Sequence, residues 1–175
     1  MSIRGRAQRF GTDINTDYII AAQHKAASLD VTEMARHTFE DIDPDFADRV
    51  RPGDVVVADA NFGCGSSRET APRVLLACGI SAVIAPSFGR IFFRNAINIG
   101  LPVTECDTSG IEQDDLVKVD LEHGLVSVPA RGLERPARPL PDVMRALLAA
   151  GGLANYLRLH GDLVLPQQQP KEART

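Results

Sequence analysis

The feature that most constrains the fold is a pair of short apolar runs, residues 54–58 and 81–85, separated by one helical stretch. Each run has the length and continuous hydrophobicity of a strand that is buried on both faces, as in parallel sheets. The stretch between them carries apolar residues at the i, i+3, i+4 and i+7 positions of one helix face, namely Ala71, Val74, Leu75 and Cys78. Gly79 follows in the position where helices often end. The pattern therefore predicts a βαβ unit.

The flanking segments extend this unit. Helical spacing returns from Phe88 to Ile99, Gly100 ends it, and residues 101–104 begin another strand. Farther along, residues 116–121 and 125–128 flank Glu122-His123-Gly124 and predict an antiparallel hairpin. The fold class is therefore α/β, with central parallel strands, crossover helices and an added antiparallel hairpin.

Four other segments are less regular. Residues 4–10 alternate loosely, as a strand does, and residues 142–150 form an amphipathic helix. A short helix is expected over residues 28–39, with Ser28 or Asp30 as its cap. The segment 41–53 contains two prolines and many acidic residues, so we expect a loop there.

Size and composition indicate one domain. The chain has 175 residues, of which 44% are hydrophobic, enough to bury a core, so residues 1–164 are expected to form a single domain. Residues 165–175 are polar and are expected to be disordered. The net charge of -4 offers no footprint for a nucleic-acid backbone. No apolar run is long enough for a membrane span and the first residues lack a signal-peptide core, so we expect a cytoplasmic protein without a nucleic-acid or membrane partner.

The cysteines and histidines give no metal motif. Cys64, Cys78 and Cys106 are odd in number and widely spaced, which matches neither a disulfide framework nor a Cys-x-x-Cys site. The four histidines lie far apart in the sequence and form no His-x-x-x-His pair, so each is expected to be an ordinary surface or core residue. We therefore expect this chain to hold no metal, and any iron or zinc to be held by another chain.

The first candidate site is the segment 61–69, which lies between a strand and the following helix, where open α/β sheets collect ligands. Two glycines allow close approach of the backbone, the helix N-terminus offers free N–H groups, and Arg68 adds a bidentate donor. Together these groups would hold a carboxylate or phosphate. The alternative is structural: Ser66 and Glu69 have the spacing of a capping box, and Glu69 can pair with Arg73.

The second candidate site is the segment 85–95, again at a junction between strand and helix. Ser87 could cap the helix, and Arg90 or Arg94 could point back toward the first site. Alternatively, the phenylalanines of this segment are core residues and its arginines form a solvated face.

Three motifs in order carry a family resemblance. They are Gly11-x-Asp13-x-x-Thr16-Asp17, Asn61-Phe62-Gly63-x-Gly65-Ser66-Ser67-Arg68-Glu69 and Ser87-Phe88-x-Arg90-Ile91-Phe92-x-Arg94-Asn95-x-x-Asn98-x-Gly100-Leu101-Pro102. This sequence resembles the small subunits of 3-isopropylmalate dehydratase and homoaconitase, equivalent to the swivelling fourth domain of aconitase. The resemblance covers residues 4–157 and implies the β/β/α fold of that swivelling domain.

The resemblance also implies an activity. Members of the family are subunits of heteromeric hydro-lyases, in which a large subunit holds a [4Fe-4S] cluster through its own cysteines. By position in the motif, Ser66 is the catalytic base, and Ser67 and Arg68 bind a substrate carboxylate. The resemblance favours 3-isopropylmalate dehydratase of leucine biosynthesis; a homoaconitase or a citramalate or dimethylmalate hydro-lyase is the alternative. A non-catalytic anion-binding module is the alternative from another class.

Two positions depart from the family pattern. Thr70 stands where the family usually has histidine after Ser-Ser-Arg-Glu. The loop at residues 21–27, which reads AAQHKAA, stands where the dehydratases commonly have Pro-x-x-Tyr-Leu and sense the variable group of the substrate. Here His24 and Lys25 could bind an additional carboxylate or polar group, or Lys25 could be a solvated lysine.

Overall fold

The structure is a computed structural model that describes residues 1–162, apart from the side chain of Lys25. The expected tail at 165–175 and the last two residues of the expected domain lie outside the described residues. Seven strands form one sheet in the order β4-β3-β2-β1-β5-β6-β7. The strands are β1 (Ser2–Arg9), β2 (Val55–Val57), β3 (Ala82–Ala85), β4 (Val103–Glu105), β5 (Leu116–Asp120), β6 (Leu125–Val128) and β7 (Leu133–Pro136).

Strand β1 joins a parallel half of the sheet to an antiparallel half. On one side Ala7 pairs with Val55 in parallel, and β2, β3 and β4 continue in the same sense. On the other side Gly5 pairs with Val117 in antiparallel register, followed by β6 and β7. The predicted βαβ unit and hairpin are both confirmed, as is the mixed α/β class.

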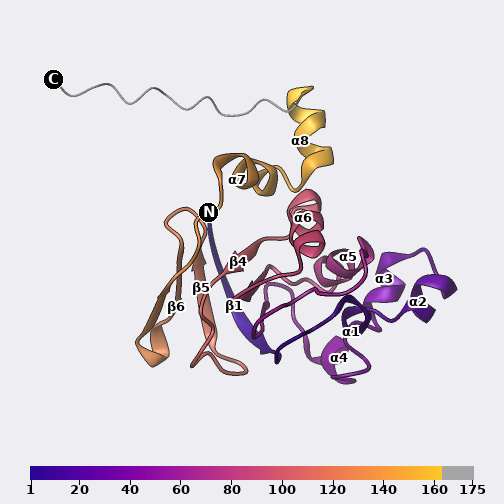
Figure 1. Cartoon of the computed structure of the whole chain (residues 1–175), viewed down its shortest axis with the longest axis horizontal. Coiled ribbons are helices and arrows are strands. Elements are labelled where there is room, and N and C mark those ends of the chain that lie inside the picture. Colours follow the sequence, from indigo (N-terminus) through magenta and orange to yellow (C-terminus); the bar gives the residue numbers. More distant parts are fainter. Residues whose placement is uncertain (163–175) are drawn as a thin grey trace.

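The helices gather beside the parallel half, away from β5 and β6 (Figure 1). Helix α5 packs against α3 and α6, and α6 also contacts α7 and α8. The helices are α1 (Thr16–Ile19), α2 (Ala22–Ala27), α3 (Val31–Ala35), α4 (Phe46–Arg49), α5 (Thr70–Ala77), α6 (Arg90–Ile99), α7 (Asp142–Ala149) and α8 (Leu153–His160), with a 3-10 turn at Pro129–Arg131.

Three sequence-based predictions need correction. Residues 21–27, described as a loop, are mostly the short helix α2 (Ala22–Ala27). The helix expected over 28–39 is only α3, and Asp30 is its cap, because the Asp30 carboxylate accepts the N–H of Thr32 at 2.8 Å. The expected loop 41–53 contains the single turn α4, where Phe46 is fully buried. Burying one aromatic side chain contributes enough stabilisation to order a short helical turn, although the polar residues around it favour a loop.

Buried phenylalanine rings form a continuous layer beneath the ends of β1 and β2. Phe10 stacks on Phe39 with ring centroids 4.2 Å apart, and Phe39 meets Phe62 edge to face at 6.5 Å. Phe62 in turn meets Phe92 of α6 at 5.2 Å. Such pairs add to the area buried, so the layer supports the loop that follows β2.

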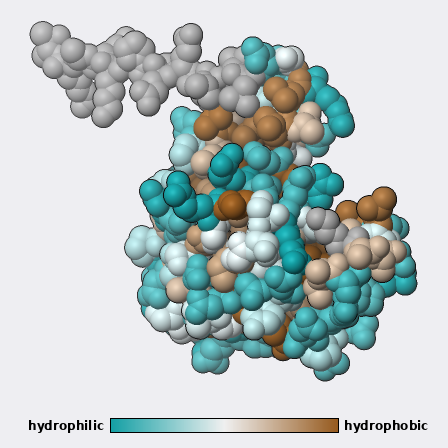
Figure 2. Space-filling model, turned by 45° about the vertical axis from the view of Figure 1, so that its right-hand side comes forward, coloured by the Kyte–Doolittle hydropathy of each residue, from teal (hydrophilic) through white to brown (hydrophobic). Residues whose placement is uncertain are grey.

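Outside the core, a few large apolar side chains are exposed. Figure 2 shows hydrophobic residues gathered at the end of the molecule formed by α7 and α8, where Leu157 and Leu159 are exposed. Leu29, between α2 and α3, is almost fully exposed. Within residues 1–162, none of the helices has the length and apolar character needed to cross a bilayer.

Candidate active site

The loop 61–69 is held between two other loops, so the structure brings the three sequence motifs together. On one side, the Thr16 N–H donates to the Cys64 carbonyl at 2.9 Å, and the Gly63 N–H donates to the Ile14 carbonyl at 2.7 Å. On the other side, the Phe62 N–H donates to the Ser87 carbonyl at 3.0 Å. These backbone hydrogen bonds fix the loop at the carboxyl ends of β2 and β3, where the sequence predicted a ligand site.

Two glycines are required for this arrangement. Gly63 has φ of +73°, and a Cβ built on it would lie 2.2 Å from Cγ of Phe92. A Cβ on Gly89 would lie 2.3 Å from the Gly63 carbonyl oxygen. The two loops therefore approach as closely as backbones without side chains allow.

Ser66 and Ser67 lie at the exposed tip of this loop. Helix α5 begins at Thr70. Glu69 occupies the N-cap position, but its side chain makes no capping hydrogen bond to the backbone of the helix. The predicted capping box is therefore wrong: Thr16 donates to the carbonyl of Ser66 at 3.0 Å and holds this residue ahead of the helix. Within residues 1–162 neither serine hydroxyl has a hydrogen-bond partner, so both are available to a ligand.

Arg68 is oriented by the first motif. Its Nη2 lies 2.5 Å from Oδ1 of Asp17, and its Nη1 donates to the Ile20 carbonyl at 3.2 Å. The Arg68 side chain is 18% exposed and that of Asp17 is 51% exposed. A role for Asp17 was not predicted, although its place beside Thr16 in the first motif was the available signal. The predicted pair between Glu69 and Arg73 is confirmed.

A cavity of about 400 Å³ adjoins Ser67. Its walls come from the end of the second motif, the first turn of α5 and one residue of the third motif. The lining residues are Ser67, Glu69, Thr70, Arg73 and Asn95. Thr70, which departs from the family pattern, therefore faces the space beside Ser67.

The third motif is arranged differently from the prediction. Arg90 and Arg94 do not turn toward the loop 61–69; they line a separate groove of about 470 Å³ beside Glu105 and Met144. Ser87 does not cap α6, whose N-cap is Gly89. Its hydroxyl instead accepts the N–H of Asn61 at 2.8 Å, because the close approach of the two loops places this donor nearer than the helix.

The cysteines do not fit an iron-sulfur cluster. Among the described residues, the one group of three or more close metal-ligating side chains contains no cysteine. Burial raises the pKa of all three thiols, that of Cys106 to about 11, and Asp13 adds to the rise at Cys64. The thiols are therefore protonated near neutral pH and are poor nucleophiles.

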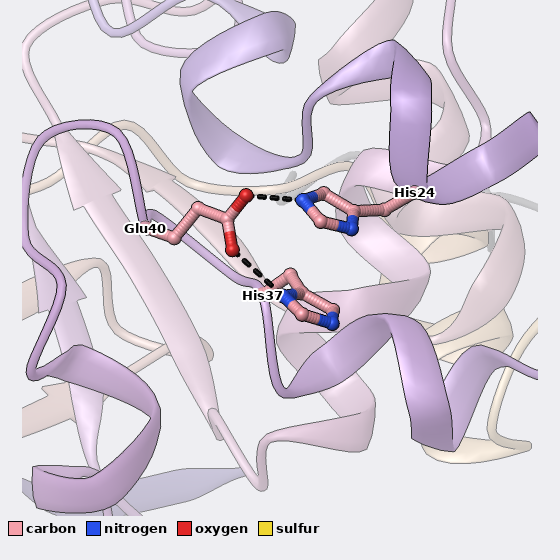
Figure 3. Close-up of side chains that lie close together, drawn as sticks. All are labelled: His24, His37 and Glu40. Atoms are coloured by element: carbon pink, nitrogen blue, oxygen red, sulfur yellow. Dashed lines mark hydrogen bonds and ion pairs between the residues drawn. The ribbon is translucent and has the colours of Figure 1, made fainter. Parts of the chain in front are cut away.

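Within residues 1–162 no hydrogen bond joins the His24 ring to Ser66, and His24 belongs to a different cluster. His24 and His37 both bond to the carboxylate of Glu40, and their rings stack with centroids 3.8 Å apart (Figure 3). The two histidines are far apart in the sequence, and they meet because the fold brings α2 against the turn after α3. Burial opposes ionisation of Glu40, but the hydrogen bonds from the two histidines lower its pKa overall.

Comparisons with known proteins identify the family of this chain. A model of the aconitase C-terminal domain matches residues 13–106. A 3-isopropylmalate dehydratase small subunit of Archaeoglobus fulgidus is 50% identical over 163 residues, covering 93% of this chain and 99% of the relative. A 2,3-dimethylmalate dehydratase small subunit of Eubacterium barkeri is 48% identical over 159 residues, covering 90% and 97%.

A solved structure gives the same result. The crystal structure of a 3-isopropylmalate dehydratase from Methanocaldococcus jannaschii is 43% identical, with a TM-score of 0.87, and the match covers 92% of this chain and 96% of that chain. The chain therefore belongs to the aconitase C-terminal domain family and, within it, to the dehydratase small subunits.

Proposed function

We propose that this chain is the small subunit of a 3-isopropylmalate dehydratase, which interconverts 2- and 3-isopropylmalate by dehydration and rehydration in leucine biosynthesis. The observation that carries the proposal is the convergence of the three motifs on the loop 61–69, where two unpaired serine hydroxyls stand beside an arginine oriented by Asp17. Relatives that align over nearly the whole chain carry the same name.

In this proposal Ser66 is the base that removes a proton next to a substrate carboxylate. A serine has a high pKa, so its alkoxide needs donors nearby. The backbone N–H groups ahead of α5 and the Arg68 guanidinium are available for this purpose. Ser67 and Arg68 bind the carboxylate, with Arg68 using the donors that Asp17 and Ile20 leave free.

The partner is a large subunit that holds the [4Fe-4S] cluster. The exposure of Ser66 and Ser67 supports this division, because a proton-transfer site needs a second surface to exclude water. The protonated, separated cysteines of this chain support it as well.

The purified chain alone is therefore expected to contain no iron and to have no dehydratase activity. Iron analysis and assays before and after addition of the large subunit test this. A stoichiometric cluster on the isolated chain would contradict the division of roles. A chain that binds malate-type anions, yet gains no activity with any cluster-bearing partner, would instead be the non-catalytic anion-binding module.

We expect Arg68→Lys to raise KM for 3-isopropylmalate about tenfold or more in the reconstituted complex. Lysine keeps the charge but loses the planar bidentate donor that matches a carboxylate. The matched control is Arg145→Lys on α7, where the arginine pairs with Asp142 at the surface. An unchanged KM in Arg68→Lys would remove this residue from the carboxylate site.

We assign the contact with the substrate's variable group to residues 21–27, which form helix α2 and the residue before it. Because the His24 ring already bonds to Glu40, we assign any contact with a polar variable group to Lys25 rather than to His24. An isopropyl group would need no such contact, and 2,3-dimethylmalate would need none either.

Lys25→Ala separates these possibilities. With 3-isopropylmalate as the natural substrate, we expect kcat/KM to change little for 3-isopropylmalate. If a carboxylate-bearing substrate is the natural one, Lys25→Ala should lower its kcat/KM. The loss should correspond to about 1.5–3 kcal/mol of transition-state binding, the contribution of one charge-assisted hydrogen bond. The assay compares wild type and variant on isopropyl-, dimethyl- and carboxylate-bearing malates, and preference for one of the latter two would replace 3-isopropylmalate.

A further inference from the structure

His24, His37 and Glu40 form a cluster that the proposed reaction does not use. His24 comes from α2, and the other two come from the turn that follows α3, so two separate segments meet here (Figure 3). The His37 Nδ1 atom lies 2.7 Å from one oxygen of Glu40, and Nε2 of His24 bonds to the other. One ligand atom from each of the three residues lies within 4.8 Å of the others.

We propose that these three side chains bind one Zn²⁺ ion, with a fourth position left for water. Two imidazoles and a carboxylate are a ligand set that zinc uses when it keeps an open position. Tetrahedral bonds of about 2.0–2.2 Å place ligand atoms roughly 3.3–3.6 Å apart, so zinc binding would require the carboxylate and the imidazoles to rotate apart from their hydrogen-bonding distance. The two rings lie only 8° from parallel, so binding would also tilt them toward a common point.

The surroundings suit a bound cation. The side chains are partly shielded, with 17% of His24, 41% of His37 and 30% of Glu40 exposed, which leaves an entry path. Both coordinating nitrogens already face the Glu40 carboxylate, and the zinc would take the place of the protons between them.

A bound zinc would fasten α2 to the turn after α3. Helix α2 follows Ile20, whose carbonyl accepts from Arg68, and the Phe39 N–H donates to the Ile19 carbonyl at 3.0 Å. The ion would therefore restrain helix α2 and the segment before it, which Arg68 contacts. This site does not depend on the proposed reaction, because its ligands are not among the groups assigned to substrate.

The test is calorimetric titration of the untagged full chain with Zn²⁺ after treatment with a chelator. One zinc per chain is expected, and Co²⁺ in its place should give a visible spectrum of nitrogen and oxygen ligation without a thiolate band. Glu40→Gln and His24→Gln keep side-chain size and should each weaken zinc by about 100-fold or more, since even outer-sphere partners cost 10–100-fold.

The matched control is His123→Gln, because His123 bonds a single carboxylate, that of Asp120, without a second imidazole. This variant should bind zinc as the wild type does. Thermal melting of every variant without metal shows whether it is folded, and only the wild type and His123→Gln should gain melting temperature with zinc. Absence of stoichiometric binding, a thiolate spectrum, or equal binding by folded Glu40→Gln would overturn the site and leave a metal-free hydrogen-bonded cluster.

Discussion

Replacing Ser66 with alanine is expected to lower kcat of the reconstituted complex by about 10²–10⁴-fold while leaving KM nearly unchanged. This is the usual contribution of a positioned base, and it is lost only in the transition state. Ser66 caps no helix, and its hydroxyl has no hydrogen-bond partner within residues 1–162. The free energy of unfolding of the variant should therefore lie within about 0.5 kcal/mol of that of the wild type. Steady-state kinetics and urea unfolding check the two parts.

Ser109→Ala is the control for this substitution. Ser109 is also an exposed loop serine, but it lies between β4 and β5 and bonds to Asp107. Its removal should leave kcat unchanged. A folded Ser66→Ala complex with full turnover would exclude Ser66 as the base and return the loop to a binding role alone.

The second large effect is expected for Gly63→Ala, which should lower the free energy of unfolding by about 2–5 kcal/mol. Two costs add: a left-handed backbone costs a residue with a Cβ about 1–2 kcal/mol, and overpacking a core costs about 1–3 kcal/mol. The overpacking arises because the new methyl group would lie 2.2 Å from Phe92. The altered loop should also reduce kcat, since Ser66 follows three residues later.

Gly53→Ala separates the two costs. Gly53 has φ of +95°, but a Cβ there meets nothing within 4 Å. Its alanine variant should therefore lose only about 1–2 kcal/mol. Urea unfolding of both variants checks this. Equal losses of unfolding free energy would show that Phe92 moves aside for the new methyl group and that its contact with Gly63 does not hold the loop.

The strands and helices with strong local patterns could be predicted from the sequence. The two apolar runs became β2 and β3, and Gly79 follows α5 with φ of +85°, as a helix-ending glycine does. Strand β7 was missed because Leu133–Pro136 is a short edge segment that ends in proline and has no strong alternation. Helix α8 was missed because only one of its residues, Tyr156, is buried and most of its side chains face outward.

The candidate site shows why local signals were insufficient. Ser66 and Glu69 have capping-box spacing, but the hydrogen bond from Thr16 holds Ser66 away from the helix, and this contact joins residues 50 apart in the sequence. Ser87 likewise accepts a hydrogen bond from the Asn61 N–H, a contact distant in sequence, instead of capping the helix. Ser66 and Ser67 lie in the segment between strand and helix, as the spacing predicted, whereas the cluster of His24, His37 and Glu40 arises only from tertiary structure.

The central position of β1 has a consequence for the order in which the protein is made. This strand is synthesised before its partners. Ala7 can pair only once Val55 has been made, and Gly5 only once Val117 has been made. Until then a nascent chain exposes a strand edge that can pair with other chains. The antiparallel edge of β1 therefore stays unpaired until β5 emerges, and growing chains that stop before residue 116 expose it.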